Sequence, residues 1–165
     1  SCGAAAAQSV LYYYGTDWGE GDLIDELETD PENGTRVDEI ELFFRKQGFK
    51  VLAGQMDAGT LRYWIDRKVP VIVLIQAWAD DGEPDDHYAD EWQEGHYVVV
   101  IGYDADKFYF DDPSIQDNRG VIPAHELELR WHDKGTDNTI YEHFGIAVYG
   151  KTPVFNPAST LKIEG

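Results

Sequence analysis

Three residues of this chain have the types and the settings that nucleophilic catalysis on a carbonyl group requires. Cys2, the only cysteine among 165 residues, opens an alanine-rich segment with the pattern of a helix. A thiol at a helix N-terminus is drawn toward the thiolate form, because the first amides are unpaired and that end carries a partial positive charge. His96 begins an apolar, β-branched run, and Asp112 closes a second apolar run just before Pro113. Such a set can supply a nucleophile, a general base and an acid that orients the base.

Each of these residues also has an ordinary structural interpretation. Most free cysteines are small buried hydrophobic residues, so Cys2 alone would leave both interpretations open. His96 can simply terminate a strand, and Asp112 before Pro113 can open a turn. Because all three residue types occur together, with His96 and Asp112 at strand ends, the sequence favours Cys2 as a nucleophile.

A predicted β-hairpin explains how His96 and Asp112 can meet. Residues 96–103 have a strand pattern, and a second strand follows after a three-residue turn at 104–106. In an antiparallel hairpin the start of the first strand lies beside the end of the second. Asp111 competes with Asp112 for the orienting role, but side chains alternate between the two faces of a strand, so only one of them can serve.

The elements that must position these residues follow from hydrophobic periodicity and from turn residues. Helices are predicted at residues 2–14, 20–28, 35–47, 57–68 and 123–131, and strands at 49–53, 69–75, 96–103, 107–111 and 144–149. Thr35 and Asp38 form a start similar to a capping box, and Asp57 or Thr60 is expected to cap the next helix. Helices come first and a mainly antiparallel sheet follows, which is typical of an α+β fold.

The length of the chain suits one domain with a hydrophobic core. We place that domain at residues 1–150 and predict that residues 151–165, which include Pro153 and Pro157, form a C-terminal tail.

Three motifs carry a family resemblance. Cys-Gly-Ala-x-Ala at residues 2–6, Gly-His-Tyr-Val-Val-Val-Ile-Gly-Tyr at 95–103 and the Asp112-Pro113 pair resemble those of the papain-like cysteine peptidases that cut double-glycine leader peptides, especially the stand-alone relatives without a transporter. The resemblance covers about residues 2–150. It implies a papain-like α+β fold and a cysteine peptidase acting on peptide or amide bonds. It also implies that Cys2 is the nucleophile, His96 the general base and Asp112 the residue that orients His96.

One departure from that family concerns the oxyanion. These peptidases usually carry a Gln a few residues before the Cys, and its amide helps to bind the developing negative charge. Only Ser1 precedes Cys2 in this chain. Gln8 is not an obvious substitute, because it lies nearly two helical turns away from Cys2. We therefore expect either a Gln upstream of Ser1 or a weak enzyme, since loss of one such donor costs about 100- to 1000-fold in rate. The backbone N–H of Cys2 is still available.

The charge of the chain excludes some classes of partner. With 32 acidic and 13 basic residues, the formal net charge is −19, which disfavours nucleic acid and anionic membrane surfaces. No apolar run is long enough to span a membrane. The expected partner is a peptide or protein substrate, with basic peptides favoured if the acidic segment 80–91 forms a rim near His96. The simpler interpretation of these acids is a solvated surface, as in adaptation to high salt.

We predict no cofactor and no metal site. The acidic segment 80–91 is rich in carboxylates but lacks the ligand spacing of a calcium-binding loop. The sequence is also compatible with two other functions. One is acyl transfer to an acceptor other than water on the same fold, and the other is non-catalytic binding of a peptide. No signal peptide opens the chain, and the sequence assigns neither a compartment nor an oligomeric state.

Overall fold

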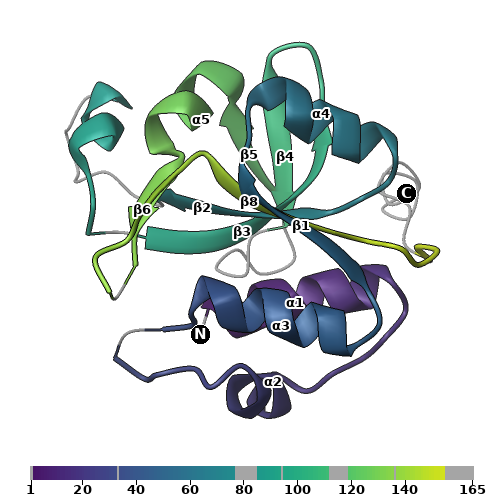
Figure 1. Cartoon of the computed structure of the whole chain (residues 1–165). Helices are drawn as coiled ribbons and strands as arrows, with labels where there is room; N and C mark the ends of the chain where they lie inside the picture. Colours follow the sequence, from purple (N-terminus) through teal and green to yellow (C-terminus); the bar gives the residue numbers. More distant parts are fainter. Residues whose placement is uncertain are drawn as a thin grey trace.

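A six-stranded antiparallel sheet separates two groups of helices in the computed structural model of this chain (Figure 1). The structure describes residues 2–32, 34–76, 85–93, 95–111, 119–135 and 137–154. In sheet order, the strands are β1 (Lys50–Gln55), β8 (Phe144–Tyr149), β2 (Val71–Gln76), β3 (Gly95–Tyr103), β4 (Lys107–Asp111) and β5 (Arg119–Pro123). A separate two-stranded ribbon pairs β6 (His132–Lys134) with β7 (Ile140–Glu142).

The helices cover both faces of the sheet. One face carries α1 (Cys2–Tyr13), α2 (Glu20–Glu26) and α3 (Val37–Lys46), and the other carries α4 (Ala58–Asp66) and α5 (Ala124–Arg130). A 3-10 helix, η1 (Asp85–Asp90), lies between β2 and β3 in the chain and packs against α5. The predicted α+β class is therefore correct.

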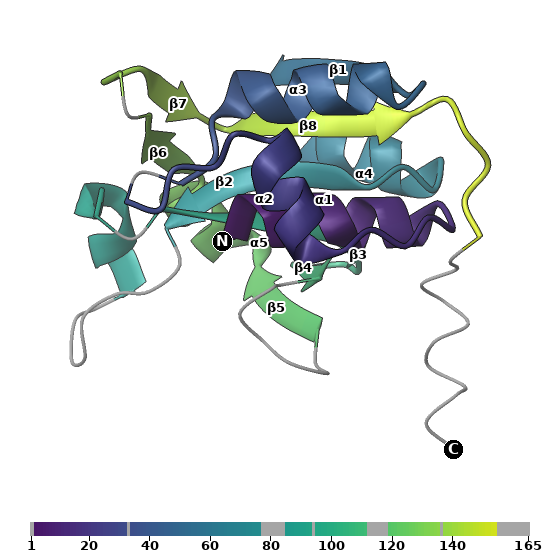
Figure 2. The ribbon, with the colours of Figure 1, turned by 90° about the horizontal axis from the view of Figure 1, so that it is seen from below.

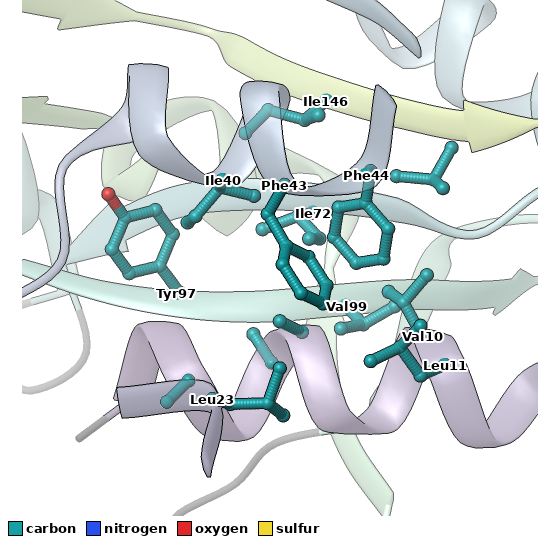
Figure 3. Packing of buried hydrophobic residues seen from close by; sticks show 14 of the residues in the cluster. Val10, Leu11, Leu23, Ile40, Phe43, Phe44, Ile72, Tyr97, Val99 and Ile146 are labelled. Atoms are coloured by element: carbon teal, nitrogen blue, oxygen red, sulfur yellow. The ribbon is translucent and has the colours of Figure 1, made fainter. Parts of the chain in front are cut away.

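Alternation along β3 divides the core in two. Tyr97 and Val99 point to α1 and α3, where they join a cluster that Figure 3 shows with Ile40, Phe43 and Phe44. Val98 and Val100 point to the opposite face and pack with residues of α4 and α5. Both faces of the central strands are thus covered, which explains why their sequences are almost continuously apolar.

Helix α1 is a buried central helix, as its nearly continuous apolar pattern predicts. It runs along β3 (Figure 2), with Ala4, Ala7 and Val10 fully buried. Small alanine side chains allow this close approach of helix and sheet. The helix ends where Gly15 adopts a φ of 87°, a left-handed conformation that glycine tolerates.

The predicted hairpin is confirmed. β3 and β4 pair antiparallel, with Val99 opposite Asp111 and Tyr103 opposite Phe108. The Asp104 carboxylate stabilises the turn between them, because its Oδ1 accepts hydrogen bonds from the backbone N–H groups of Asp106 and Lys107, each at 3.2 Å. His96 therefore lies at the same edge of the sheet as the end of β4.

Two details of the sequence prediction differ from the structure. The strands β5, β6 and β7 were not expected, since they are short and lack clear alternation. The capping box at Thr35 is wrong: Arg36 is the N-cap of α3 and no side chain caps it. Thr35 is instead buried, and its hydroxyl is paired with that of Thr29 at 2.8 Å. By contrast, Asp57 does cap α4, accepting from the Thr60 N–H at 2.7 Å.

Candidate active site

Cys2 and His96 come together where the first turn of α1 meets the start of β3. Cys2 is the first residue of α1 and is partly buried. Burial raises the pKa of its thiol, but hydrogen bonds with the His96 side chain and the Tyr97 backbone, together with the charge of His96, more than offset that effect. The pKa of Cys2 is therefore lower than that of an ordinary thiol. A thiol in this setting is prepared to act as a nucleophile.

His96 is held firmly at the beginning of β3. Only 6% of its surface is exposed to solvent. The residue opposite it in the sheet is Ile75 of β2. A buried imidazole interacts more strongly with a partly buried thiol than two exposed groups would interact, because the effective dielectric constant there is lower than in water.

The position of Asp111 argues against its role as the orienting acid. Asp111 pairs with Val99, three residues and about 10 Å along the strand from His96. Alternation also places the Asp111 side chain on the face opposite that of His96. Asp112 lies outside the described residues, and its assignment as the orienting acid stays a prediction.

Sequence reasoning missed a polar network next to His96. Gln76, at the end of β2, is fully buried, and its Nε2 donates to the His132 carbonyl at 3.0 Å and to Asp133 Oδ1 at 3.2 Å. The Gln76 carbonyl accepts from Arg130 Nε at 2.8 Å. Because Gln76 pairs with Gly95, the network fixes the backbone that leads directly into His96.

Asp133 packs closely against Gly95. A Cβ at Gly95 would lie 2.6 Å from the Asp133 carboxyl carbon, closer than real Cβ contacts. Burial raises the pKa of Asp133, in spite of hydrogen bonds from the Lys134 backbone and Gln76 and of the charge of His132. Two features of the sequence could have indicated this network: a polar Gln at the end of an otherwise apolar strand, and a Gly before His96. Nothing in the sequence connects either of them with Asp133.

The described part of the acidic segment packs on α5 and β6. The Arg130 guanidinium lies 4.5 Å from the centre of the Tyr88 ring, and His132 Nε2 donates to the Glu91 carbonyl at 2.6 Å. The Trp92 ring packs against the His132 ring at an angle of 52°, with 4.4 Å between the ring centres. Trp92, just after the acidic segment, is therefore in contact with β6.

Gln8 is occupied away from the thiol. Its Nε2 donates to the carbonyl of Trp18 at 2.8 Å. The amide is thereby committed to the loop after α1, as its distance from Cys2 along the helix suggests. The backbone N–H of Cys2, at the first position of α1, has no partner within the helix and is therefore placed to bind an oxyanion.

The described residues contain neither a candidate metal site nor a membrane-spanning helix. No group of three or more His, Cys, Asp or Glu side chains in that part of the chain could hold a metal ion. Among the same residues, no helix combines the length and the apolar character needed to cross a membrane.

Comparison with known proteins gives one family match. The sequence model of the peptidase C39 family matches residues 1–135. No curated protein matches the chain.

Several solved structures share the fold. The peptidase domain of Streptococcus ComA, a bi-functional ABC transporter involved in a quorum sensing pathway, is 20% identical with a TM-score of 0.65, and the match covers 91% of each chain. A putative C39-like peptidase from Bacillus anthracis is 16% identical with a TM-score of 0.66, covering 92% of this chain and 89% of the other.

A third structure contains a bound peptide. It is a double glycine motif protease from an AMS/PCAT transporter in complex with its leader peptide, 15% identical with a TM-score of 0.60, and the match covers 90% of this chain and 83% of the other. At these identities the likeness shows the fold, which is that of papain-like cysteine peptidases.

Proposed function

This chain belongs to the peptidase C39 family, and we propose that it is a cysteine peptidase with Cys2 as nucleophile, His96 as general base and Asp112 as the acid that orients His96. The observation that carries the proposal is the hydrogen bond between the Cys2 thiol and the His96 side chain, with the lowered pKa of that thiol. The cysteine peptidase fold supports the same reaction class.

The proposed reaction proceeds in two halves. The Cys2 thiolate attacks the peptide carbonyl carbon, and the resulting oxyanion accepts a hydrogen bond from the backbone N–H of Cys2. The protonated His96 gives its proton to the leaving amine as the C–N bond breaks, which leaves a thioester on Cys2. His96 then takes a proton from water, and the resulting hydroxide attacks the thioester carbon. The C–S bond breaks, which releases the peptide fragment as a carboxylic acid and returns Cys2 to the thiolate.

Leader peptides that end in two glycines are the substrates to test first. This choice follows from the family of the chain and from the leader peptide bound to a protein of the same fold. Acyl transfer uses the same thioester, so an added amine acceptor distinguishes the two reactions. A hydrolase releases the free acid, and a transferase yields the amide of the acceptor.

We expect Cys2 to be alkylated by iodoacetamide at pH 6. The rate rises as the pH passes the pKa of the thiol, and that pKa is lowered by His96 and Tyr97. An ordinary thiol, with a pKa near 8.5, is well under about 1% ionised at pH 6. The measurement is the alkylation rate between pH 5 and pH 9, followed by mass, and the peptidase activity should disappear in parallel. A rate that follows an ordinary thiol would contradict the proposal.

We also propose a preference for basic peptides, from the acidic segment 80–91. Changing Asp85 and Asp86 to Asn should reduce the preference for Lys or Arg near the scissile bond by a few-fold, because exposed charge pairs contribute about 0.2–1 kcal/mol. The preference should also fade at high salt, where the screening length becomes a few ångströms. Competition between matched basic and acidic peptides at two ionic strengths measures both effects. Equal cleavage under all conditions would leave these acids as solvated surface.

A further inference from the structure

The residue after His96 contacts two parts of the chain that surround the nucleophile. Tyr97 is buried, and its hydroxyl donates to the Thr35 carbonyl at 2.7 Å across 62 residues of sequence. The backbone of the same residue forms a hydrogen bond with the Cys2 thiol. Figure 3 shows the Tyr97 ring beside Ile40, with its oxygen directed to the segment that leads into α3. Tyr97 therefore joins β3 to that segment and to α1.

Thr35 connects the Tyr97 hydroxyl with the first turn of α1. It is buried, its hydroxyl is paired with that of Thr29 at 2.8 Å, and it packs directly on Gly3. A Cβ at Gly3 would lie 2.5 Å from the Thr35 Cβ, a distance that real Cβ atoms essentially never show. Because Gly3 follows Cys2, the position of Thr35 against α1 is tied to the turn that carries the nucleophile.

Tyrosine hydroxyls also hold the opposite end of α1. The Tyr13 hydroxyl donates to the Lys68 carbonyl at 3.0 Å, and the Tyr14 hydroxyl donates to the Val148 carbonyl at 2.6 Å. These bonds fix the helix against the sheet more than two turns from Cys2. The bond from Tyr97 to Thr35 is the corresponding connection at the catalytic end of the helix.

We propose that Tyr97 and Thr35 are positioning residues, which set the separation of Cys2 and His96 by joining the start of β3 to the first turn of α1. The inference rests on the proposed function. The thiol and the imidazole lie on different elements, and their hydrogen bond depends on how these two elements are placed. Misplacement of reacting groups by about 1 Å can cost 100-fold in rate.

The Tyr97 hydroxyl acts as a neutral donor. Burial raises the pKa of this phenol, and so do the charges of Cys2 on α1, Asp133 on β6, Tyr141 on β7 and Asp38 on α3. The hydroxyl therefore keeps its proton over the working range of the enzyme. Replacing Tyr97 by Phe removes a hydrogen bond and no charge, so a change in the titration of Cys2 would report a change in geometry.

The test compares Tyr97→Phe with Tyr14→Phe. Both changes remove a buried hydroxyl that donates to a backbone carbonyl, but Tyr14 lies at the far end of α1. We expect similar losses of thermal stability. Only Tyr97→Phe should raise the apparent pKa of Cys2 alkylation toward that of a free thiol and lower kcat about 10- to 100-fold with little change in KM. If the two variants have the same thiol titration and the same kcat, the inference is wrong.

A second pair of variants covers the case in which Tyr97→Phe does not fold. Gly3→Ala should displace Thr35 and change the titration of Cys2, whereas Gly21→Ala in α2 meets no atom within 4 Å and should leave it unchanged. If wild-type Cys2 titrates as an ordinary thiol, the proposed function fails and the positioning inference fails with it. If wild-type Cys2 is activated and both Tyr97→Phe and Gly3→Ala leave it so, only the positioning inference fails.

Discussion

Replacing Cys2 with alanine should lower kcat/KM for cleavage of a double-glycine leader peptide by at least about 10⁴-fold, because the thiolate that forms the thioester is gone. His96→Gln should cause a similar loss, since the thiol then has no base and the leaving amine no proton donor. The double variant should be no worse than either single one, because a nucleophile and its base act as one unit. Single-turnover cleavage measured by mass gives all three rates.

Gln8→Ala is the control for these variants. Gln8 lies on the same helix, but its amide is occupied by the Trp18 carbonyl, so we expect kcat/KM within a few-fold of wild type. Multiplicative losses from Cys2→Ala and His96→Gln would argue that the two residues act separately. A loss from Gln8→Ala as large as that of an oxyanion donor, about 100- to 1000-fold, would contradict the assignment of Gln8 as structural.

The second large effect is expected at Asp112. Asp112→Asn should lower kcat by up to about 10⁴-fold, because an amide no longer holds the imidazole in the required tautomer or stabilises its protonated form. KM should change little, since the carboxylate acts on His96 and not on the substrate. The measurement is steady-state kinetics on the same leader peptide.

Asp111→Asn is the matched control, being the same chemical change one residue earlier. Asp111 pairs with Val99 and, by alternation, is on the face of the sheet opposite to His96, so its replacement should be nearly neutral. If Asp111→Asn abolishes activity and Asp112→Asn does not, the two assignments must be exchanged.

Local patterns were sufficient for most of the architecture. The apolar periodicity of α1, the turn between β3 and β4 and the capping of α4 by Asp57 all depend on residues close in sequence, and the structure has each of them. The weaker patterns failed. β6 and β7 are short strands that pair with each other, and β6 also lies against β2 and β3.

The capping box at Thr35 failed for a different reason. Its residue types are those that cap helices, but Thr35 is buried between Gly3 and Tyr97, and its hydroxyl is paired with Thr29. A tertiary contact therefore overrode a local preference. Burial at this place made the same threonine a candidate for positioning the nucleophile, which no pattern near it could indicate.

Residue identities and their spacing were enough to indicate which side chains could do the chemistry. A single cysteine before an alanine-rich helix, a histidine at the head of one strand and an aspartate after its hairpin partner are identities and spacings, and the hairpin of β3 and β4 places His96 at the edge where β4 ends. The lowering of the Cys2 pKa, by contrast, follows from contacts that exist only in the folded chain. The pKa of Cys2 depends on burial, on His96 and on the Tyr97 backbone, groups more than ninety residues away in sequence. Gly3, Thr35, Gln76 and Asp133 likewise matter because of what they touch across the fold, and contacts of that kind leave no periodic signal in the chain.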